Sequence, residues 1–280
     1  WRNGCSRWDL LDVVRATAAL RPEGIEWPRH DDGRPSFKLE HLSAANGLAH
    51  AQAHDALSDV RATIALATLI RNRQPRLWNF CLALRQKQAV LTEIGSDRPF
   101  IHVSAMYGAE RGGMAVVWPL AQHPTNRNEL IVWDLIHDPA ELADLDTEQI
   151  RLRLFSKTED LPEGMTRLPI RSLAINRSPI VIGNLKVLTP AVIERWHIDM
   201  ETIARHTETA RRLTPQLASR MDEVYQRPRP QGTAPDVDGD LYGGFIGNDD
   251  RRRLDDWRAR VDAAGMLLTG AAAGATAATS

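Results

Sequence analysis

A histidine and an aspartate stand five residues apart where a helix is predicted to begin, His54 just before it and Asp59 one turn inside. A carboxylate oxygen can hold a divalent cation, and a histidine with an unperturbed pKa of about 6.5 can take a proton from water. Together they suit metal-assisted phosphodiester hydrolysis. His50 and Asp55 compete for the same roles, although Asp55 also suits the helix N-cap. Because such pairs are common near helix starts, the spacing also fits a site without chemistry.

A run of basic and aromatic residues follows. Residues 60–90 hold six Lys or Arg and no Asp or Glu, with Trp78 and Phe80 among them. Residues 151–186 hold seven Lys or Arg against three Asp or Glu. Basic groups for the backbone and aromatic faces for the bases are the two ingredients of single-strand binding. A solvated helix face with a core tryptophan explains the same pattern without any ligand.

The composition of the 280-residue chain is that of a globular protein, with 43% hydrophobic and 25% charged residues. These values exclude collagen, a pure coiled coil and wholesale disorder. The net charge of −1 carries no information about partners. No apolar run is long enough to span a membrane, and from the given residues we expect no signal peptide. Cys5 and Cys81 are too few for a disulfide framework, so we expect a cytoplasmic protein with no membrane partner.

Periodicity and turn signals predict the elements that position these residues. The four apolar residues of the third predicted helix, Leu57, Val60, Ile64 and Ala67, are expected to form its buried stripe, and Trp118, Trp133 and Trp196 are expected in the core. A domain boundary or hinge is predicted at 72–75, a linker at 227–240 and a further helix near Asp249. Predicted helices cover 7–20, 39–45, 55–71, 76–92 and 189–223, and predicted strands cover 98–105, 114–120, 129–136 and 178–187.

Several long stretches match one known family in order and spacing. They include SRWDLLDVVRA (6–16), LRPEGIEWP (20–28), PSFKLEHLSAANGLAHAQAHDALSDVRATIALATLI (35–70), RQPRLWNF (73–80), HVSAMYGAERGG (102–113), HPTNRNELIVWDL (123–135) and DGDLYGGF (238–245). Over roughly residues 1–260 the chain resembles the bacterial exodeoxyribonuclease I family of DEDDh (DnaQ-like) 3′→5′ exonucleases.

The resemblance implies an α+β multidomain fold. Residues 1–73 would be the C-terminal part of an RNase H-like α/β exonuclease domain, and 74–228 an SH3-like β domain with flanking helices. Residues 229–265 would start a helical C-terminal domain. The Ala/Gly-rich tail at 266–280 is low-complexity sequence that we expect to be disordered.

The resemblance also implies an activity: Mg²⁺-dependent 3′→5′ hydrolysis of single-stranded DNA to 5′-mononucleotides, in DNA repair and recombination. His54 would be the general base and Asp59 the last carboxylate of a site that normally holds two Mg²⁺ ions. The family's Asp-x-Glu motif and second-motif aspartate would lie upstream of Trp1, leaving three of four metal carboxylates out. We therefore expect this chain to be inactive alone. The alternatives are a non-catalytic module that binds single-stranded DNA or peptide, and a gene remnant.

The same resemblance implies binding residues and a monomeric state. Phe37 could equally be a core ring, and Lys38 stands where the family has an arginine, which keeps the charge but loses the bidentate fork. Arg21 and Phe80 match part of a pocket for the acidic C-terminal tail of single-stranded-DNA-binding protein, with Phe80 in place of a tyrosine. The implied contacts to single-stranded DNA are Trp1, Arg15, Phe37, Lys38, Lys87, Arg171 and Asn176.

Overall fold

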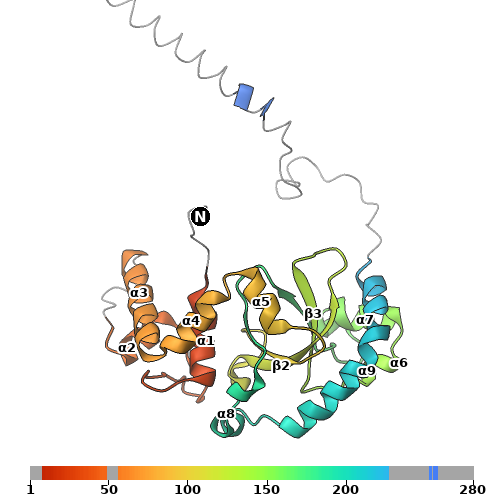
Figure 1. The fold of residues 1–280 in the computed structure, drawn as a ribbon, viewed down its shortest axis with the longest axis horizontal. Coiled ribbons are helices and arrows are strands. Elements are labelled where there is room, and N and C mark those ends of the chain that lie inside the picture. Colours follow the sequence, from red (N-terminus) through yellow and green to blue (C-terminus); the bar gives the residue numbers. More distant parts are fainter. Residues whose placement is uncertain (1–7, 49–55, 227–251, 254, 258–280) are drawn as a thin grey trace, which may run out of the picture. The chain divides into compact units, whose positions relative to one another are not determined.

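The computed structural model describes residues 8–48, 56–226, 252–253 and 255–257 (Figure 1). The chain divides into two compact units, Trp1–Arg227 and Pro228–Ser280. In the second unit the described residues are all helical. Trp1, His50, His54 and Asp55 lie outside the described residues. So do Cys5, the predicted linker at 227–240, the predicted start of a helix at Asp249, and the 266–280 tail.

Three helices open the first unit: α1 (Leu10–Leu20), α2 (Leu39–Ala45) and α3 (Ala56–Arg73). The N-cap of α1 is Asp9, whose carboxylate accepts a hydrogen bond from the amide of Leu11 at 2.8 Å. Just after α2, Asn46 holds the preceding loop, because its amide group bonds both the backbone N–H and the carbonyl of Glu26. The predicted helix at 39–45 is confirmed with the same bounds, and those at 7–20 and 55–71 are confirmed with shifted ends.

The predicted buried stripe of α3 is wrong. Ala62, Leu66 and Ile70 are the buried residues of this helix, whereas Leu57, Val60 and Ile64 are 56%, 55% and 60% exposed. Both sets have helical spacing, so periodicity alone does not decide which face packs. The small side chain of Ala62 lets α3 approach α1 and α2, with which it is in contact.

Two short helices, rather than the single helix predicted at 76–92, connect α3 to the sheet. They are α4 (Pro75–Ala83) and α5 (Lys87–Ile94). Between them, Arg85 Nε donates to the carbonyl of Leu82 at 3.0 Å and so satisfies the end of α4. Pro75 is the first residue of α4, where its missing N–H has no cost. The predicted interruption at 72–75 is thus a helix–helix junction.

An antiparallel five-stranded sheet forms the centre of the first unit, in the order β4-β3-β2-β1-β5. The four predicted strands are confirmed, three of them with shorter bounds and the one at 114–120 extended to Gln122, but β4 was not predicted, because its five residues lack a clear alternation. Trp118 and Trp133 are fully buried, as predicted. The strands are β1 (Phe100–Val103), β2 (Met114–Gln122), β3 (Glu129–Asp134), β4 (Ile170–Ala174) and β5 (Ile180–Ile182).

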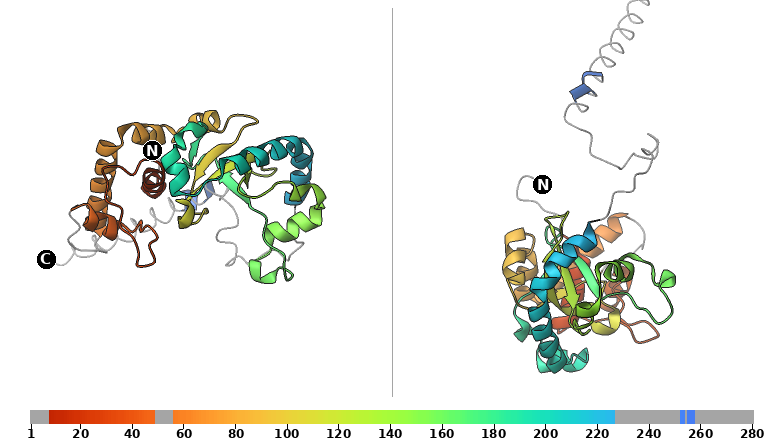
Figure 2. Two further views of the ribbon diagram at one scale, coloured as in Figure 1. Left: turned by 90° about the horizontal axis from the view of Figure 1, so that it is seen from below. Right: turned by 90° about the vertical axis from the view of Figure 1, so that its right-hand side faces the viewer.

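Further helices pack around this sheet (Figure 2): α6 (Glu141–Asp144), α7 (Thr147–Phe155), α8 (Pro190–Arg195) and α9 (Met200–Tyr225). The sequence analysis did not predict α6 or α7, and it merged α8 with α9. The long helix α9 contacts β2 and α7. Arg220 of α9 donates to the carbonyls of Leu142 and Leu145, and this fixes α6. Trp196 is only partly buried, and its indole donates to the carbonyl of Ala19 at 3.0 Å.

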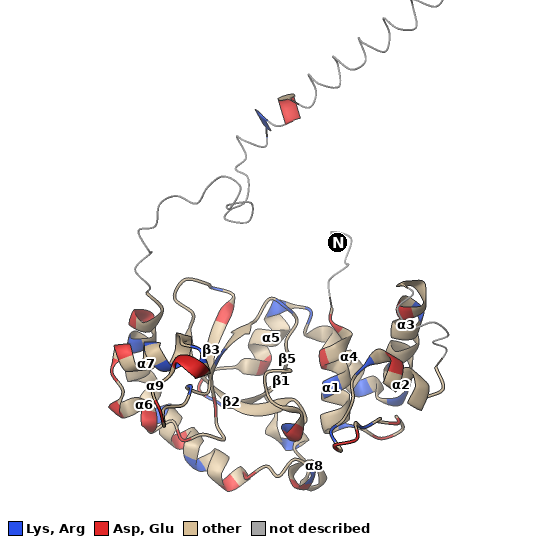
Figure 3. Ribbon diagram, turned by 180° about the vertical axis from the view of Figure 1, so that it is seen from behind, with Lys and Arg blue, Asp and Glu red and all other residues tan. Residues whose placement is uncertain are grey.

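The short helix α6 carries two acidic residues, Glu141 and Asp144, whereas Arg85 and Lys87 lie just before and at the start of α5 (Figure 3). Among the described residues, no helix is both long and apolar enough to cross a bilayer.

Candidate nucleic-acid interface

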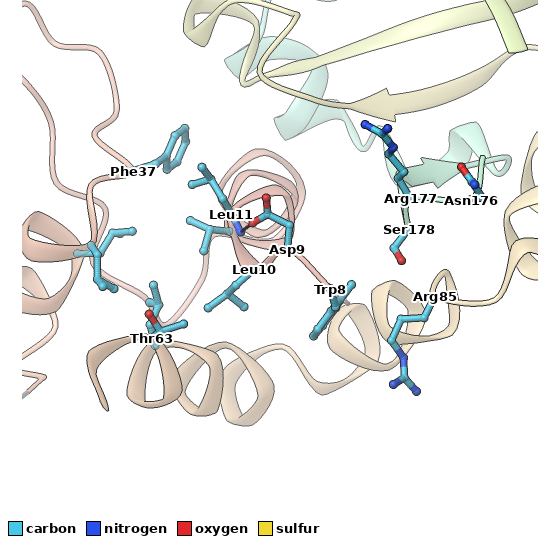
Figure 4. Close-up of a pocket in the computed structure, with 14 residues that line it drawn as sticks. Trp8, Asp9, Leu10, Leu11, Phe37, Thr63, Arg85, Asn176, Arg177 and Ser178 are labelled. Carbon is cyan, nitrogen blue, oxygen red and sulfur yellow. Dashed lines mark hydrogen bonds between the residues drawn. The ribbon is translucent and has the colours of Figure 1, made fainter. Parts of the chain in front are cut away.

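A cavity of about 1190 Å³ lies where α1, α2 and α3 face the β4–β5 turn (Figure 4). Phe37 and Thr63 lie on one side of the cavity, and Arg85, Asn176 and Arg177 lie on the other. Apolar side chains form the floor. The lining residues are Trp8, Asp9, Leu10, Leu11, Val14, Phe37, Leu39, Leu42, Thr63, Leu66, Arg85, Asn176, Arg177 and Ser178. We call it the main cavity.

The wall formed by Arg85, Asn176 and Arg177 carries two guanidinium groups and one amide. Asn176 and Arg177 belong to the β4–β5 turn and are exposed. This turn is tight: the backbone of Arg177 bonds the carbonyl of Ala174, and Ser178 has a φ of +54°. Guanidinium groups bind phosphate oxygens through paired N–H donors. The wall therefore suits a phosphodiester backbone.

Aromatic side chains stand at the edges of the main cavity. The rings of Trp8 and Trp78 pack edge to face with centroids 4.9 Å apart. The buried indole nitrogen of Trp8 has no hydrogen-bond partner among the described residues. Phe37, half-buried, packs edge to face on Trp27 at 6.4 Å and also lines the cavity. Its ring therefore both packs against Trp27 and lines the cavity, and its contact with DNA stays a prediction.

Asp59 lies in the first turn of α3 and is partly buried. Its carbonyl accepts a hydrogen bond from the hydroxyl of Thr63 at 2.8 Å, and Thr63 lines the main cavity one turn further on. His54 lies outside the described residues. Within the described ranges, no three His, Cys, Asp or Glu side chains come together as a possible metal site. The described residues, Asp59 included, therefore do not provide enough ligands for a pair of Mg²⁺ ions.

Arg15 lies on α1, and its side chain reaches the turn before β2. Its guanidinium donates to the carboxylate of Asp12 at 2.6 Å. Burial raises the pKa of Asp12, although the Arg15 charge and hydrogen bond act in the opposite direction. A Cβ at Gly113, where φ is +64°, would lie 3.5 Å from Arg15 Cδ. The carboxylate and the glycine turn together restrict this arginine, which would otherwise be flexible.

Hydrogen bonds connect the predicted binding residues Lys87 and Asn176 through the turn before β3. Lys87, the first residue of α5, donates from Nζ to the side-chain oxygen of Asn128 at 2.8 Å. The carbonyl of Asn128 accepts from the amide of Ile175, next to Asn176. Arg171 lies on β4, where its guanidinium donates to the carbonyl of Ile170 at 3.1 Å. None of this packing was predictable from spacing.

Buried polar residues lie inside the sheet beside this edge. The ring of His102 bonds the hydroxyl of Tyr107 at 2.9 Å, and burial lowers the pKa of His102 to about 3. Burial also raises the pKa of Tyr107. Arg111 binds both carboxylate oxygens of Asp134, at 2.5 and 2.9 Å. This set stays neutral or paired at physiological pH, so it stabilises the strands rather than providing an acid or base.

A second cavity, of about 670 Å³, contains both residues that were assigned to the partner pocket, Arg21 and Phe80. Arg21 is the C-cap of α1, and its guanidinium donates to the carbonyl of Leu20 at 2.5 Å. The other lining residues are Leu20, Gln74, Pro75, Arg76, Leu77, Glu93, Ile182, Asn184 and Val187. A cation beside an apolar wall suits a chain end that has a free carboxylate and an apolar side chain. We call it the second cavity.

Only some of the predicted site residues line the two cavities. Phe37 and Asn176 line the main cavity from opposite sides. The predicted residues that line neither cavity are Arg15, Lys38, Asp59, Lys87 and Arg171. Lys38 is exposed at the N-cap of α2.

The sequence analysis counted Arg85 of the main cavity only as one of six basic residues at 60–90, and it did not single out Trp8 or Arg177. Signals for them existed. Trp8 lies inside the SRWDLLDVVRA stretch, Arg85 belongs to the basic run at 60–90, and Arg177 follows Asn176 directly.

Comparison with known proteins gives consistent matches. The family model of the exonuclease I SH3-like domain matches residues 85–227. Exodeoxyribonuclease I of Escherichia coli K12 is 42% identical over 256 residues, covering 91% of this chain and 53% of that protein. The structure of E. coli exonuclease I with a dA16 oligonucleotide has a TM-score of 0.82 at 40% identity, over 92% of this chain and 55% of that one.

A structure of SSB/exonuclease I in complex with the inhibitor CFAM is also similar. Its TM-score is 0.77 at 39% identity, over 90% of this chain and 52% of that chain. The chain therefore spans about half the length of the relatives that it matches.

Proposed function

Because the chain belongs to the exonuclease I family, whose SH3-like domain it carries, we propose that it is part of a 3′→5′ exodeoxyribonuclease. The substrate would be single-stranded DNA, and the products would be 5′-mononucleotides. Named relatives with this activity and related structures that hold oligonucleotides support the proposal. We place the protein in DNA repair and recombination, as a cytoplasmic monomer. Its domains would follow the boundaries at residues 73 and 228 expected from the sequence, with an RNase H-like exonuclease part first.

The observation that carries the proposal is the make-up of the main cavity. Arg85 and Arg177 supply positive charge on one wall, and Trp8 and Phe37 supply aromatic surface. Single-stranded nucleic acid offers a charged backbone and exposed bases, and it binds where both needs are met together. Duplex DNA hides its bases in the stack and would use only the charges. The cavity therefore favours single strands.

DNA binding can be measured without any metal. We expect the fluorescence anisotropy of a 5′-fluorescein-labelled dT16 strand to increase when this chain is added in the presence of EDTA. The affinity should fall as salt rises. The logarithm of the association constant should decrease with the logarithm of the salt concentration, with a slope of about −0.7 for each phosphate neutralised. A duplex of the same length should compete poorly. Equal competition by the duplex, or no binding by dT16, would contradict the proposal.

For the hydrolytic reaction we propose Asp59 as one metal-binding carboxylate and His54 as the general base. Mg²⁺ would supply charge neutralisation and an activated water when bound. The described residues contain no cluster that could hold even one metal ion, so we derive no hydrolytic step from them. We infer instead that this chain by itself binds single-stranded DNA without cleaving it.

The second cavity supports a partner proposal. Arg21 would take the terminal carboxylate of an acidic peptide, and the apolar wall with Phe80 would take its last side chain. We propose the C-terminal tail of single-stranded-DNA-binding protein as this peptide. The similar structure of SSB/exonuclease I supports this choice.

A second candidate function is a binding module without any chemistry. The complete core of the sheet region favours it, because Trp118, Trp133 and their neighbours are fully buried. A cooperative thermal transition together with DNA binding would fit either function. Absence of a cooperative transition would instead favour a gene remnant.

A further inference from the structure

The turn between β2 and β3 forms hydrogen bonds with two other segments, α5 and the β4–β5 turn, and each of these carries a predicted DNA-binding residue. Asn128 lies in this turn, and its side-chain oxygen accepts a hydrogen bond from Lys87 Nζ at 2.8 Å. Its backbone carbonyl accepts from the amide of Ile175, also at 2.8 Å. Ile175 immediately precedes Asn176, which lines the main cavity. One residue therefore ties α5 to the β4–β5 turn.

We infer that Asn128 is a positioning residue, which holds the ammonium group of Lys87 ready for a DNA phosphate. The inference rests on the proposed single-strand binding. A lysine side chain loses rotamer entropy when it binds, so a contact that fixes it beforehand lowers the cost of binding. An ammonium group has three N–H donors, and Asn128 uses one of them. Two donors remain for a phosphate.

The neutral amide of Asn128 matters as much as its position. A carboxylate at this place would cancel the charge that attracts the phosphate, whereas an amide oxygen orients the ammonium and leaves its charge intact. Arg15 shows the contrast within the same chain, since its guanidinium is paired with the Asp12 carboxylate at 2.6 Å. Lys87 thus keeps a full positive charge on an exposed, oriented side chain.

The turn itself does not depend on the side-chain bond to Lys87. Asn126 donates to the carboxylate of Glu129 at 2.9 Å and accepts from the amide of Asn128 at 3.0 Å. Gln122 donates to the carbonyl of Glu129 at 2.5 Å. These bonds, and the backbone bond to Ile175, remain when the Asn128 side chain is shortened. An exposed hydrogen bond also contributes little to stability.

The test is a double-mutant cycle on this chain, with dT16 anisotropy in EDTA and thermal melting as the two measurements. We expect Asn128→Ala to weaken dT16 binding about threefold, because one lysine is no longer pre-ordered. In a Lys87→Ala background the same change should have no further effect. Asn128→Asp keeps an acceptor but cancels the charge, so it should bind at least as weakly as Lys87→Ala. Melting temperatures should not change.

Gln122→Ala is the matched control, since it loosens the same turn without touching Lys87. The inference is overturned if Gln122→Ala weakens binding as much as Asn128→Ala, because turn order would then explain the loss. An equal loss from Asn128→Ala with and without Lys87 would overturn it as well. If Lys87→Ala weakens binding and Asn128→Ala does not, only this inference fails. If the unaltered chain binds no dT16, the proposed function fails and this inference with it.

Discussion

The sheet region (residues 100–225) and the helical region (residues 10–83) differ in how completely they bury their apolar residues. In the sheet region Trp118 and Trp133 are 0% exposed. In the helical region one face of α3 presents Leu57, Val60 and Ile64, each more than half exposed. Both regions contain amphipathic elements, and the most exposed large apolar side chain of the sheet region is Ile136, at 50%.

This difference suggests that the sheet region contributes most to stability, whereas the helical region contributes most to binding. The sheet region has a close-packed core, and the buried side chains of the helical region belong to the same hydrophobic cluster. The helical region supplies most of the lining of the main cavity, but it also carries an apolar face of the kind that marks an interaction surface or an aggregation liability. We therefore expect core substitutions in the sheet to unfold the chain and substitutions on the exposed α3 face to leave it folded.

The largest expected effect is at Trp133. Trp133→Ala should lower the free energy of unfolding by about 4 kcal/mol, because it empties a fully buried site and removes the indole bond to the carbonyl of His137. Ile64→Ser, on the exposed face, should change it by about 0.5 kcal/mol or less. Urea unfolding measures both. Similar losses at the two positions would remove the distinction between the regions.

The next effect is a loss of stability in acid. The pKa of His102 is lowered to about 3 in the folded chain, from about 6.5 when unfolded. Between pH 3 and pH 6.5, His102 is protonated in the unfolded chain but not in the folded chain. The contribution of neutral His102 to the free energy of unfolding is therefore fully present above pH 6.5 and is lost as the pH falls towards 3. Between pH 6.5 and 4.5 the loss should be about 2 kcal/mol.

Urea unfolding at several pH values measures this loss. His102→Gln should flatten the slope over this range. His30→Asn, at an exposed histidine of the helical region, should not. An unchanged slope in His102→Gln would show that other groups govern the acid sensitivity.

An effect of similar size concerns the contact between the two regions. A Cβ at Gly112 would lie 2.7 Å from the ring of Trp196, which bonds the carbonyl of Ala19 in α1. Gly112→Ala should cost about 2 kcal/mol, since φ is +65° and the ring must move. Gly33→Ala is the matched control, because φ is +81° there but nothing lies within 4 Å. Its cost should be about 1 kcal/mol, from backbone strain alone. Equal losses in thermal melting would mean that Trp196 can move freely.

The smallest expected effect concerns the second cavity. Arg21→Ala should weaken binding of an acidic peptide with a free C-terminal carboxylate about tenfold, through loss of a charge-assisted contact. Amidating that peptide should have a similar effect on the unaltered chain, and dT16 binding should not change. Isothermal titration measures each affinity. If amidation has no effect, the carboxylate role of Arg21 is wrong.

The sequence predicted the elements better than their faces. Proline and glycine signals located α2, the junction at Gln74–Pro75 and the turn at Gly112–Gly113. The α3 face was wrong because Leu57 and Leu66 belong to equally apolar stripes, and only tertiary packing selects between them. Strand β4 was missed because its five residues lack a clear alternation.

The site was predictable only in part. Arg21 and Phe80 were grouped by the family resemblance, and they do line one cavity. The bond between Lys87 and Asn128 joins residues of separate elements. No local pattern indicates such a contact, because it depends on sheet order and turn geometry. His54 and Trp1 lie outside the described residues, so their roles stay predictions.

The central claim is that this chain binds single-stranded DNA without cutting it. One gel tests it: the chain is incubated with a 5′-labelled single-stranded oligonucleotide, with Mg²⁺ or with EDTA, and run under native and denaturing conditions. We predict a shifted band in the native lanes and an intact strand in every denaturing lane. A Mg²⁺-dependent ladder that shortens from the 3′ end, or the absence of any shift, would contradict the account.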